Sequence, residues 1–385
     1  MSSEPAFIPL SVPHLAGNEW TYIKDCLDTG WVSSVGSYVT RFENDLAAAA
    51  GTRHAVATNC GTAALHISML VAGVRPGDEV LVSSMTFIAP VNAIRYANAV
   101  PVLVDAEPMH WQMDVGQVKT FLTTGCERRE DGVFNRSTGR RVSAIIPVHI
   151  LGHPVDMASL MALAAEFNLT VIEDATESLG SLYRGRPVGG IGHLGCYSFN
   201  GNKIITTGGG GMIVTQDEAL AKKARYLTTQ AKDDPQEYIH HEVGYNYRLT
   251  NIQAAFGCAQ MEALAGHVRR RREIHTLYRK RLAGTPGLQF QAEAEGVVSN
   301  CWLTTVRVDR NTFGRTAREL RDRLKAARIE ARPLWQPGHL SPAHQDGVKL
   351  PCPVAEDLFE NCLSLPSCSS SSDEDIERVC AVITG

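Results

Sequence analysis

Short β-branched runs alternate with amphipathic helical patterns over the first two thirds of this chain. The runs occupy residues 54–58, 79–83, 101–104, 143–148 and 169–174. Between them, residues 62–73 and 156–167 carry apolar side chains at three- and four-residue spacing, which is typical of helices packed on a sheet. Strands that alternate with helices in this way predict an α/β fold with a mostly parallel sheet sandwiched by helices.

The pattern changes after Thr250. A long helical stretch covers residues 251–284, and it is followed by a strand at 301–308 and helices at 315–328 and 373–383. Because 385 residues are enough for more than one domain, we predict two parts. Residues 1–265 form an N-terminal segment and a large domain, and residues 266–385 form a linking helix and a small C-terminal α+β domain.

The serine run 369–372 resembles a flexible linker, but its spacing favours a helix start. Ser371 with Glu374, and Ser372 with Asp375, both have the spacing of a capping box.

Composition excludes several classes of function. The net charge is -4 and no basic block dominates, so nucleic acid is not an expected partner, and we interpret Arg269–Arg272 as a solvated helix face. No run of eighteen apolar residues occurs and the N-terminus lacks a signal-peptide pattern, so we expect a cytoplasmic protein without a membrane segment. Ten scattered cysteines without a C-x-x-C pair indicate reduced thiols and no metal site.

Three glycine-containing stretches are candidates either for a phosphate-binding turn or for a tight turn that lets two backbone segments approach. Gly190–Gly195 matches G-x-G-x-x-G, but a polar turn precedes it and a strand-like run follows, so we do not predict a dinucleotide site there. Gly208–Gly211 lacks the Lys-Ser/Thr of a P-loop and is expected to form a tight turn. Gly61 and Thr62 lie where a strand gives way to a helix, which is a favourable place for an anion.

Chemically useful side chains follow successive strands. Asp174 ends the run 169–174, Phe87 follows another strand, and Lys203 lies a strand and a turn further on. A partly desolvated lysine near other cations is a nucleophile towards aldehydes, a carboxylate can pair with a protonated ring nitrogen, and an aromatic ring can stack on a flat one. Singly, each has a simpler explanation: a solvated lysine, a helix cap, a core aromatic. The lysine, the carboxylate and the aromatic ring, together with the turn at Gly61 and Thr62 that favours an anion, are what a site for pyridoxal phosphate requires.

The segments GTAAL, SMTF, IEDATES, YSFNGNKIITTGGGGM and GYNYRLTNIQAAFG follow one another in the chain. In this order they strongly resemble the DegT/DnrJ-type nucleotide-sugar aminotransferases of the fold type I pyridoxal phosphate group, over nearly the whole chain. Within that family, stretches such as GWVSSVGSYVTRFE and PVHILGHPVDM look like the aminotransferase of bacterial legionaminic-acid pathways. GDP-perosamine synthases look somewhat more distant.

The resemblance implies roles for the cofactor residues. Lys203 would form the internal aldimine with pyridoxal 5′-phosphate and shuttle protons, and lysine rather than histidine at this position favours amino transfer over dehydration. The other implied contacts are Asp174 to the pyridine nitrogen, Phe87 stacked on the ring, Gly61, Thr62 and Ser198 to the phosphate, and Asn246 to the phosphate from a partner subunit. The last contact implies a homodimer with shared active sites. Glu177 falls where relatives often carry glutamine or histidine near the cofactor's hydroxyl, and its role stays open.

Five further residues are candidates for the substrate. By resemblance, Trp31, Ser33 and Ser34 form the sugar pocket, although a structural loop is the alternative. His149 lies at a strand end, where a substrate contact and a hydrogen-bonded structural histidine are both plausible. Arg248 either contacts nucleotide phosphates or pairs with a carboxylate across the dimer.

The implied reaction moves an amino group from glutamate to C4 of a UDP-linked 4-keto-6-deoxy N-acetylhexosamine, in cell-surface sugar biosynthesis. The alternative within the family is a GDP-perosamine synthase, which acts on GDP-4-keto-6-deoxymannose. The alternative of another class is a regulatory protein that binds the cofactor without turnover, which the lack of a DNA-binding segment disfavours.

Overall fold

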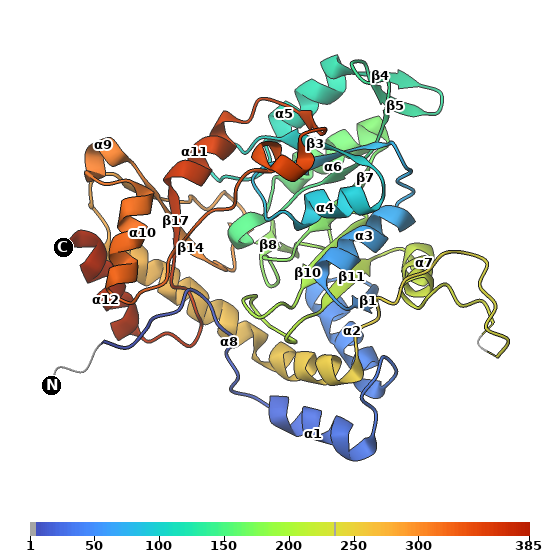
Figure 1. Cartoon of the computed structure of the whole chain (residues 1–385), viewed down its shortest axis with the longest axis horizontal. Helices are drawn as coiled ribbons and strands as arrows, with labels where there is room; N and C mark the ends of the chain where they lie inside the picture. Colours follow the sequence, from blue (N-terminus) through green and yellow to red (C-terminus); the bar gives the residue numbers. More distant parts are fainter. Residues whose placement is uncertain (1–4, 235) are drawn as a thin grey trace.

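A ten-stranded sheet forms the centre of the molecule (Figure 1), in a computed structural model that describes residues 5–234 and 236–385. Its main path runs in the order β1 (His54–Thr58), β11 (Gly211–Thr215), β10 (Leu194–Ser198), β7 (Thr170–Asp174), β6 (Arg141–Ile146), β2 (Glu79–Ser83), β3 (Val100–Val104) and β16 (Val348–Lys349). All pairs from β10 to β16 are parallel. The predicted α/β fold with a largely parallel sheet is therefore confirmed.

Two parts of this sheet depart from the parallel pattern. Strand β11 is antiparallel to both β1 and β10, because the turn at Gly208–Gly211 returns the chain directly beside β10. A Cβ on Gly211 would lie 2.5 Å from the Cys60 carbonyl oxygen, so only glycine fits this approach of two backbones. The hairpin of β4 (Cys126–Arg129) and β5 (Gly132–Asn135) extends the sheet beside β6.

Helices cover both faces of the sheet. They are α2 (Ser37–Ala50), α3 (Gly61–Val71), α4 (Ala89–Tyr96), α5 (Val115–Thr120), α6 (Met157–Phe167) and α7 (Glu218–Thr228). Helix α1 (Glu19–Thr29) packs instead against α8 (Asn251–Arg281). Strand β2 shows the two faces directly, because successive side chains point to opposite sides. Val80 and Val82 join the core cluster under α2, α3 and α4, whereas Leu81 joins the cluster under α5 and α6.

A second sheet lies at the far end of the long helix α8 (Asn251–Arg281), as Figure 1 shows. Its strands are β12 (Leu288–Phe290), β14 (Thr304–Val308), β17 (Cys362–Leu365) and β15 (Arg332–Pro333). The helices around it are α9 (Arg310–Phe313), α10 (Ala317–Ala326), α11 (Pro353–Asn361) and α12 (Asp373–Thr384). Three two-residue strands, β8 (Leu182–Tyr183), β9 (Arg186–Pro187) and β13 (Val297–Val298), form a small third sheet.

The helix starts after residue 250 follow capping chemistry. Thr250 and Gln253 form a capping box that begins α8, and Ser372 with Asp375 begins α12. Of the two serine pairs expected from the sequence, the second is therefore the one used. Helix α8 runs unbroken through residue 265, so the boundary between residues 265 and 266 lies inside a helix, and the division into two domains stays a prediction.

No helix in the described ranges is long and apolar enough to cross a membrane.

Two glycines inside α8 are expected to respond oppositely to alanine. A Cβ on Gly257 would lie 2.7 Å from the fully buried ring of Phe42, whereas nothing lies within 4 Å of a Cβ on Gly266. Gly257→Ala should lower the free energy of unfolding by about 1–3 kcal/mol through overpacking. Gly266→Ala should raise it by about 0.5–1 kcal/mol, because alanine is the better helix former. Urea unfolding measures both, and changes of the same sign would contradict the packing described for α8.

Candidate functional site

A pocket of about 370 Å³ lies at the carboxyl ends of the parallel strands. Seven residues expected to hold the cofactor line it: Gly61, Thr62, Phe87, Asp174, Glu177, Ser198 and Lys203. They come from the start of α3, from the loop after β2, from the end of β7 and its following turn, and from β10 and its following turn. Open α/β sheets bind ligands at this edge. The residues that the sequence places after the ends of successive strands do line one pocket.

Lys203 lies in the turn between β10 and β11, and its side chain is 13% exposed. Its Nζ lies 3.5 Å from Glu177 Oε1 and 4.2 Å from the centre of the Trp302 ring. The carboxylate and the aromatic face both attract an ammonium group. Neighbouring cations are the expectation from the sequence, but the structure places an anion and a π-face beside the amine.

Glu177 is held from both sides. Its Oε2 accepts a hydrogen bond from the Leu151 amide at 2.8 Å, while its Oε1 faces Lys203. Burial raises the pKa of Glu177 to about 7, although the Lys203 charge opposes the rise. This carboxyl therefore changes its protonation state near neutral pH, directly beside the amine of the pocket.

Asp174 ends β7 with its side chain buried at the pocket. Its Oδ1 accepts a hydrogen bond from the Thr176 amide at 3.1 Å, and no described cation forms an ion pair with it. Burial raises the pKa of Asp174, and the contacts with Thr176 and the charge of Lys203 only partly oppose this. A buried carboxyl without its own cation suits a ligand that brings a protonated ring nitrogen.

The opposite end of the pocket is suited to an anion. Gly61 begins the 11-residue helix α3, whose first-turn amides have no partner within the helix. A Cβ on Gly61 would lie 2.8 Å from the Ser198 Cβ, so glycine lets these two segments approach closely. Cys60 caps the helix by accepting a hydrogen bond from the Ala63 amide at 3.3 Å. Cys60, which is the exposed one among ten free cysteines, was not among the expected site residues.

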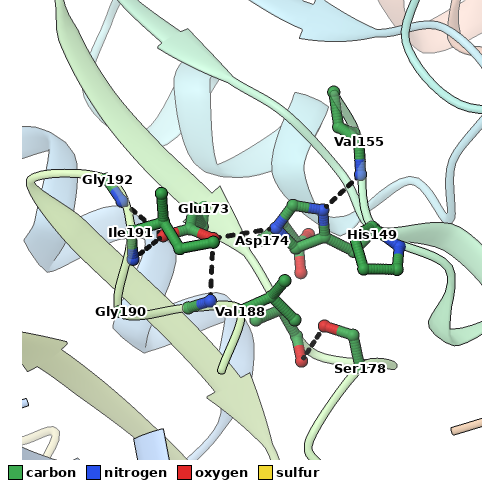
Figure 2. A network of polar contacts seen from close by, with 12 residues as sticks. His149, Val155, Glu173, Asp174, Ser178, Val188, Gly190, Ile191 and Gly192 are labelled. Carbon is green, nitrogen blue, oxygen red and sulfur yellow. Dashed lines mark hydrogen bonds and ion pairs between the residues drawn. The ribbon is translucent and has the colours of Figure 1, made fainter. Parts of the chain in front are cut away.

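The glycine stretch Gly190–Gly195 binds an anion from its own chain (Figure 2). The buried carboxylate of Glu173 accepts hydrogen bonds from the amides of Gly189 and Ile191, each at 2.7 Å, and of Gly192 at 2.5 Å. Strand β10 begins at Leu194, so no helix follows the motif. The stretch is therefore a turn built around a side chain, as its sequence context predicted.

His149 is a structural residue in this geometry, and the substrate contact expected as one of two alternatives is corrected here. Its ring is fully buried, Nε2 lies 3.0 Å from Glu173 Oε2, and Nδ1 accepts from the Val155 amide at 3.1 Å (Figure 2). Because Nδ1 accepts from the Val155 amide, Nε2 is the nitrogen that donates to Glu173 Oε2. Burial alone would raise the pKa of Glu173, but the hydrogen bonds from His149 and the backbone hold it below the ordinary value.

Arg248 pairs with a carboxylate of its own chain. Its guanidinium donates to Glu43 Oε1 and to the Ala57 carbonyl of the same chain, and its side chain is 11% exposed. Glu43 is a buried carboxylate that pairs with Arg225 as well. Arg248 therefore has a carboxylate partner within its own chain, while its expected contact with nucleotide phosphates or with a carboxylate across the dimer stays a prediction.

Trp31, Ser33 and Ser34 lie outside this pocket, on a loop anchored by the start of α8. The Asn251 side chain donates to the Trp31 carbonyl at 2.8 Å, and the Asn251 amide donates to the Ser33 carbonyl at 2.6 Å. A Cβ on Gly36 would lie 2.2 Å from the Asn251 side chain, so that side chain fills the space a larger residue would need. The sugar-pocket role of the three residues stays a prediction.

Asn246 does not line the pocket of its own chain. Its side chain is exposed, and its backbone forms a bridge with Thr229. A contact with the cofactor of a partner subunit therefore also stays a prediction.

Two tryptophans that were not among the expected site residues also line the pocket. The Trp302 and Trp335 rings are stacked with centres 6.2 Å apart and planes 6° apart, and both line the pocket. They come from the last third of the chain, where no motif marks them.

The pocket residues fit pyridoxal phosphate in chemistry as well as in type. An anion-binding helix start, an aromatic ring, a buried carboxyl without its own cation and an amine all face one pocket. In the described ranges, no group of three or more His, Cys, Asp or Glu side chains is placed to hold a metal ion.

Comparisons with known proteins agree with this chemistry. The model of the DegT/DnrJ/EryC1/StrS aminotransferase family matches residues 13–384. The chain is 40% identical to EpsN of Bacillus subtilis (strain 168) over 384 residues, which cover 98% of this chain and 95% of EpsN. It is 38% identical to the GDP-perosamine synthase of Escherichia coli O157:H7 over 380 residues, 98% of each chain. The PLP form of Spr1654 from Streptococcus pneumoniae superposes with a TM-score of 0.87 at 26% identity, covering 98% of each chain.

Glu177 should make the stability of the cofactor-free protein depend on pH. Its pKa is about 7 in the folded chain and about 4.5 in the unfolded one, so it stabilises the fold below pH 4.5 and loses this contribution as pH rises through 7. Glu177→Gln removes this titration. Between pH 4.5 and 8, the free energy of unfolding of the variant should therefore rise relative to that of the wild type, by up to about 3 kcal/mol. Urea unfolding across this range measures it. The exposed Glu218→Gln serves as control, and a pH-independent difference at position 177 would contradict the assignment.

Proposed function

Because the chain belongs to the DegT/DnrJ/EryC1/StrS aminotransferase family, we propose that Lys203 and Asp174 serve amino transfer from glutamate to C4 of a nucleotide-linked 4-keto-6-deoxy sugar. Membership of this family establishes that the chain is a pyridoxal-phosphate-dependent sugar aminotransferase. The observation that carries the residue assignment is the shared pocket of Lys203, Asp174 and the α3 start.

Each side chain has one task in the proposed reaction. Bound pyridoxal phosphate supplies the electron sink for the carbanion formed on the amino donor and then on the sugar. Asp174 holds a proton on the ring nitrogen, while Gly61, Thr62 and Ser198 bind the phosphate through amides and hydroxyls. Lys203 Nζ would move the proton from Cα of the amino donor to the cofactor, and in the second half of the reaction from the cofactor to C4 of the sugar.

Glu177 Oε1 supports this proton transfer. At 3.5 Å from Nζ, it stabilises the lysine as a cation once the amine is free. With a pKa of about 7, Glu177 can also exist as the neutral acid in the same position.

For the sugar, we propose the UDP-linked 4-keto-6-deoxy N-acetylhexosamine, as in legionaminic-acid biosynthesis, on the resemblance of several sequence stretches. The 38% identity to a GDP-perosamine synthase over 98% of both chains favours GDP-4-keto-6-deoxymannose as a second candidate. The two differ in the base and at C2 of the sugar, so one enzyme is expected to prefer one of them clearly.

We also propose a homodimer that completes the site. Exposed Asn246 and the half-exposed Trp31 lie outside the pocket of their own protomer and are available to a second copy. By the same resemblance, Asn246 would contact the phosphate in the partner's pocket. As a separate proposal, we expect the protein to work in the cytoplasm.

Lys203→Ala should abolish the near-visible absorption band of lysine-bound pyridoxal phosphate. The wild type should show this band, and glutamate should convert it to the band of the aminated cofactor. Lys222→Ala, on the exposed side of α7, should behave as the wild type. A persistent lysine-linked band in the Lys203 variant would place the cofactor lysine elsewhere.

Incubation with glutamate and either nucleotide sugar should separate the two substrate candidates. We expect 2-oxoglutarate and aminated sugar from the UDP-linked substrate, with kcat/KM at least about tenfold higher than for the GDP-linked one. Product from the GDP sugar alone would replace the first candidate by the second.

A further inference from the structure

We infer that Arg271, which does not itself line the pocket, is a positioning residue that holds Lys203 in place. Its guanidinium, the Ser11 hydroxyl and Trp302 form a hydrogen-bonded network that ends on the carbonyl of Asn202, the residue directly before Lys203. The inference rests on Lys203 as the cofactor lysine.

Arg271 is an unusual residue to find inside the protein. It lies on α8 with a relative exposure of 1%, and no described carboxylate forms an ion pair with it. Its Nε has no hydrogen-bond partner in the described part of the chain. Burying a cation without an anion opposes folding, so stability alone gives no reason for an arginine at this position.

The hydrogen bonds of Arg271 lead in two directions. One terminal nitrogen donates to the backbone carbonyl of Trp302, and the other donates to the Ser11 hydroxyl at 3.1 Å. The Ser11 hydroxyl donates in turn to the Asn202 carbonyl at 3.0 Å. A neutral hydroxyl that accepts from a cation becomes a better donor, so the relay strengthens the second bond.

Trp302 brings the other branch to the same atom. Its indole Nε1 donates to the Asn202 carbonyl at 2.8 Å, and its ring face lies 4.2 Å from Lys203 Nζ. The network therefore fixes Lys203 at two points: the peptide before it and the amine at its tip.

The surroundings of Arg271 do not offer an alternative use of its charge. His267, four residues earlier on the same helix, has its pKa lowered to about 4, by burial and then by the His14 and Arg271 charges, and is neutral at pH 7. Burial also lowers the pKa of Arg271, to about 10, which leaves it charged. The charge is directed instead to the Trp302 carbonyl and the Ser11 hydroxyl.

The test compares two cofactor forms on the full-length chain after removal of its cofactor. Pyridoxal phosphate must react with Lys203, whereas pyridoxamine phosphate binds without a bond to lysine. Arg271→Met should slow formation of the lysine-linked absorption band by about tenfold or more, because a displaced amine reacts poorly. The affinity for pyridoxamine phosphate, followed by tryptophan fluorescence, should remain that of the wild type.

Arg270→Met is the matched control, since Arg270 lies on the same helix and pairs with Asp373 at the surface. It should leave both measurements unchanged. Equal rates for Arg271→Met and Arg270→Met would overturn the inference, and so would a loss of pyridoxamine phosphate affinity by the same factor as the rate.

Ser11→Ala provides a second variant that removes only the relay, so a failure of Arg271→Met to fold does not decide the matter. Slower band formation in Ser11→Ala supports the network, and a wild-type rate refutes it. A wild-type chain that forms no lysine-linked band would instead refute the assignment of Lys203 itself, with Lys203→Ala as the reference.

Discussion

The end of strand β7 determines most of the site. Glu173 and Asp174 are adjacent in an extended strand, so their side chains point to opposite faces. Glu173 turns towards the glycine stretch and His149, where its charge is fully hydrogen-bonded. Asp174 turns towards the pocket, where its charge has no cation of its own. One carboxylate therefore stabilises the scaffold while its neighbour is left free for a ligand.

The surroundings of Glu173 and the pocket around Asp174 differ in how fully they pair the buried charges. Around Glu173, the His149 imidazole and backbone amides hold the pKa of the buried carboxyl below its ordinary value. In the pocket, two buried carboxyls, Asp174 and Glu177, share one lysine, and burial raises the pKa of both. Perturbed groups of this kind concentrate where chemistry takes place, because folding alone would select complete pairing. Binding of a cationic ring nitrogen would supply part of what the pocket lacks.

Strand-end reasoning found much of this site because parallel strands deliver their following residues to one edge of the sheet. Lys203, Asp174, Phe87 and Gly61 were predicted in this way, and all four line the pocket. Strand ends alone do not show that His149 points into the protein. Its hydrogen-bond partner, Glu173, comes to lie beside it only through the register of the neighbouring strands.

Long-range contacts account for the remaining misses. Trp302 and Trp335 both follow α8 in the chain and lie next to strands β14 and β15 of the second sheet, yet both line the pocket. Arg248 follows Asn246 by two residues, which made it a candidate ligand contact, but it pairs with Glu43 of α2. The periodicity of the sequence did not predict a helix in that segment. Pairings of this kind depend on tertiary packing, which local patterns do not contain.

The anchor between Asn251 and the loop before α2 limits how the chain can vary. Asn251 donates to the Trp31 carbonyl and accepts from the Tyr38 amide, while its side chain occupies the space beside Gly36. A larger residue at 36 would displace the asparagine, and a larger residue at 251 would have no room beside the loop. The two positions, far apart in the sequence, are therefore expected to change only together among related chains, as a pair that preserves the loop.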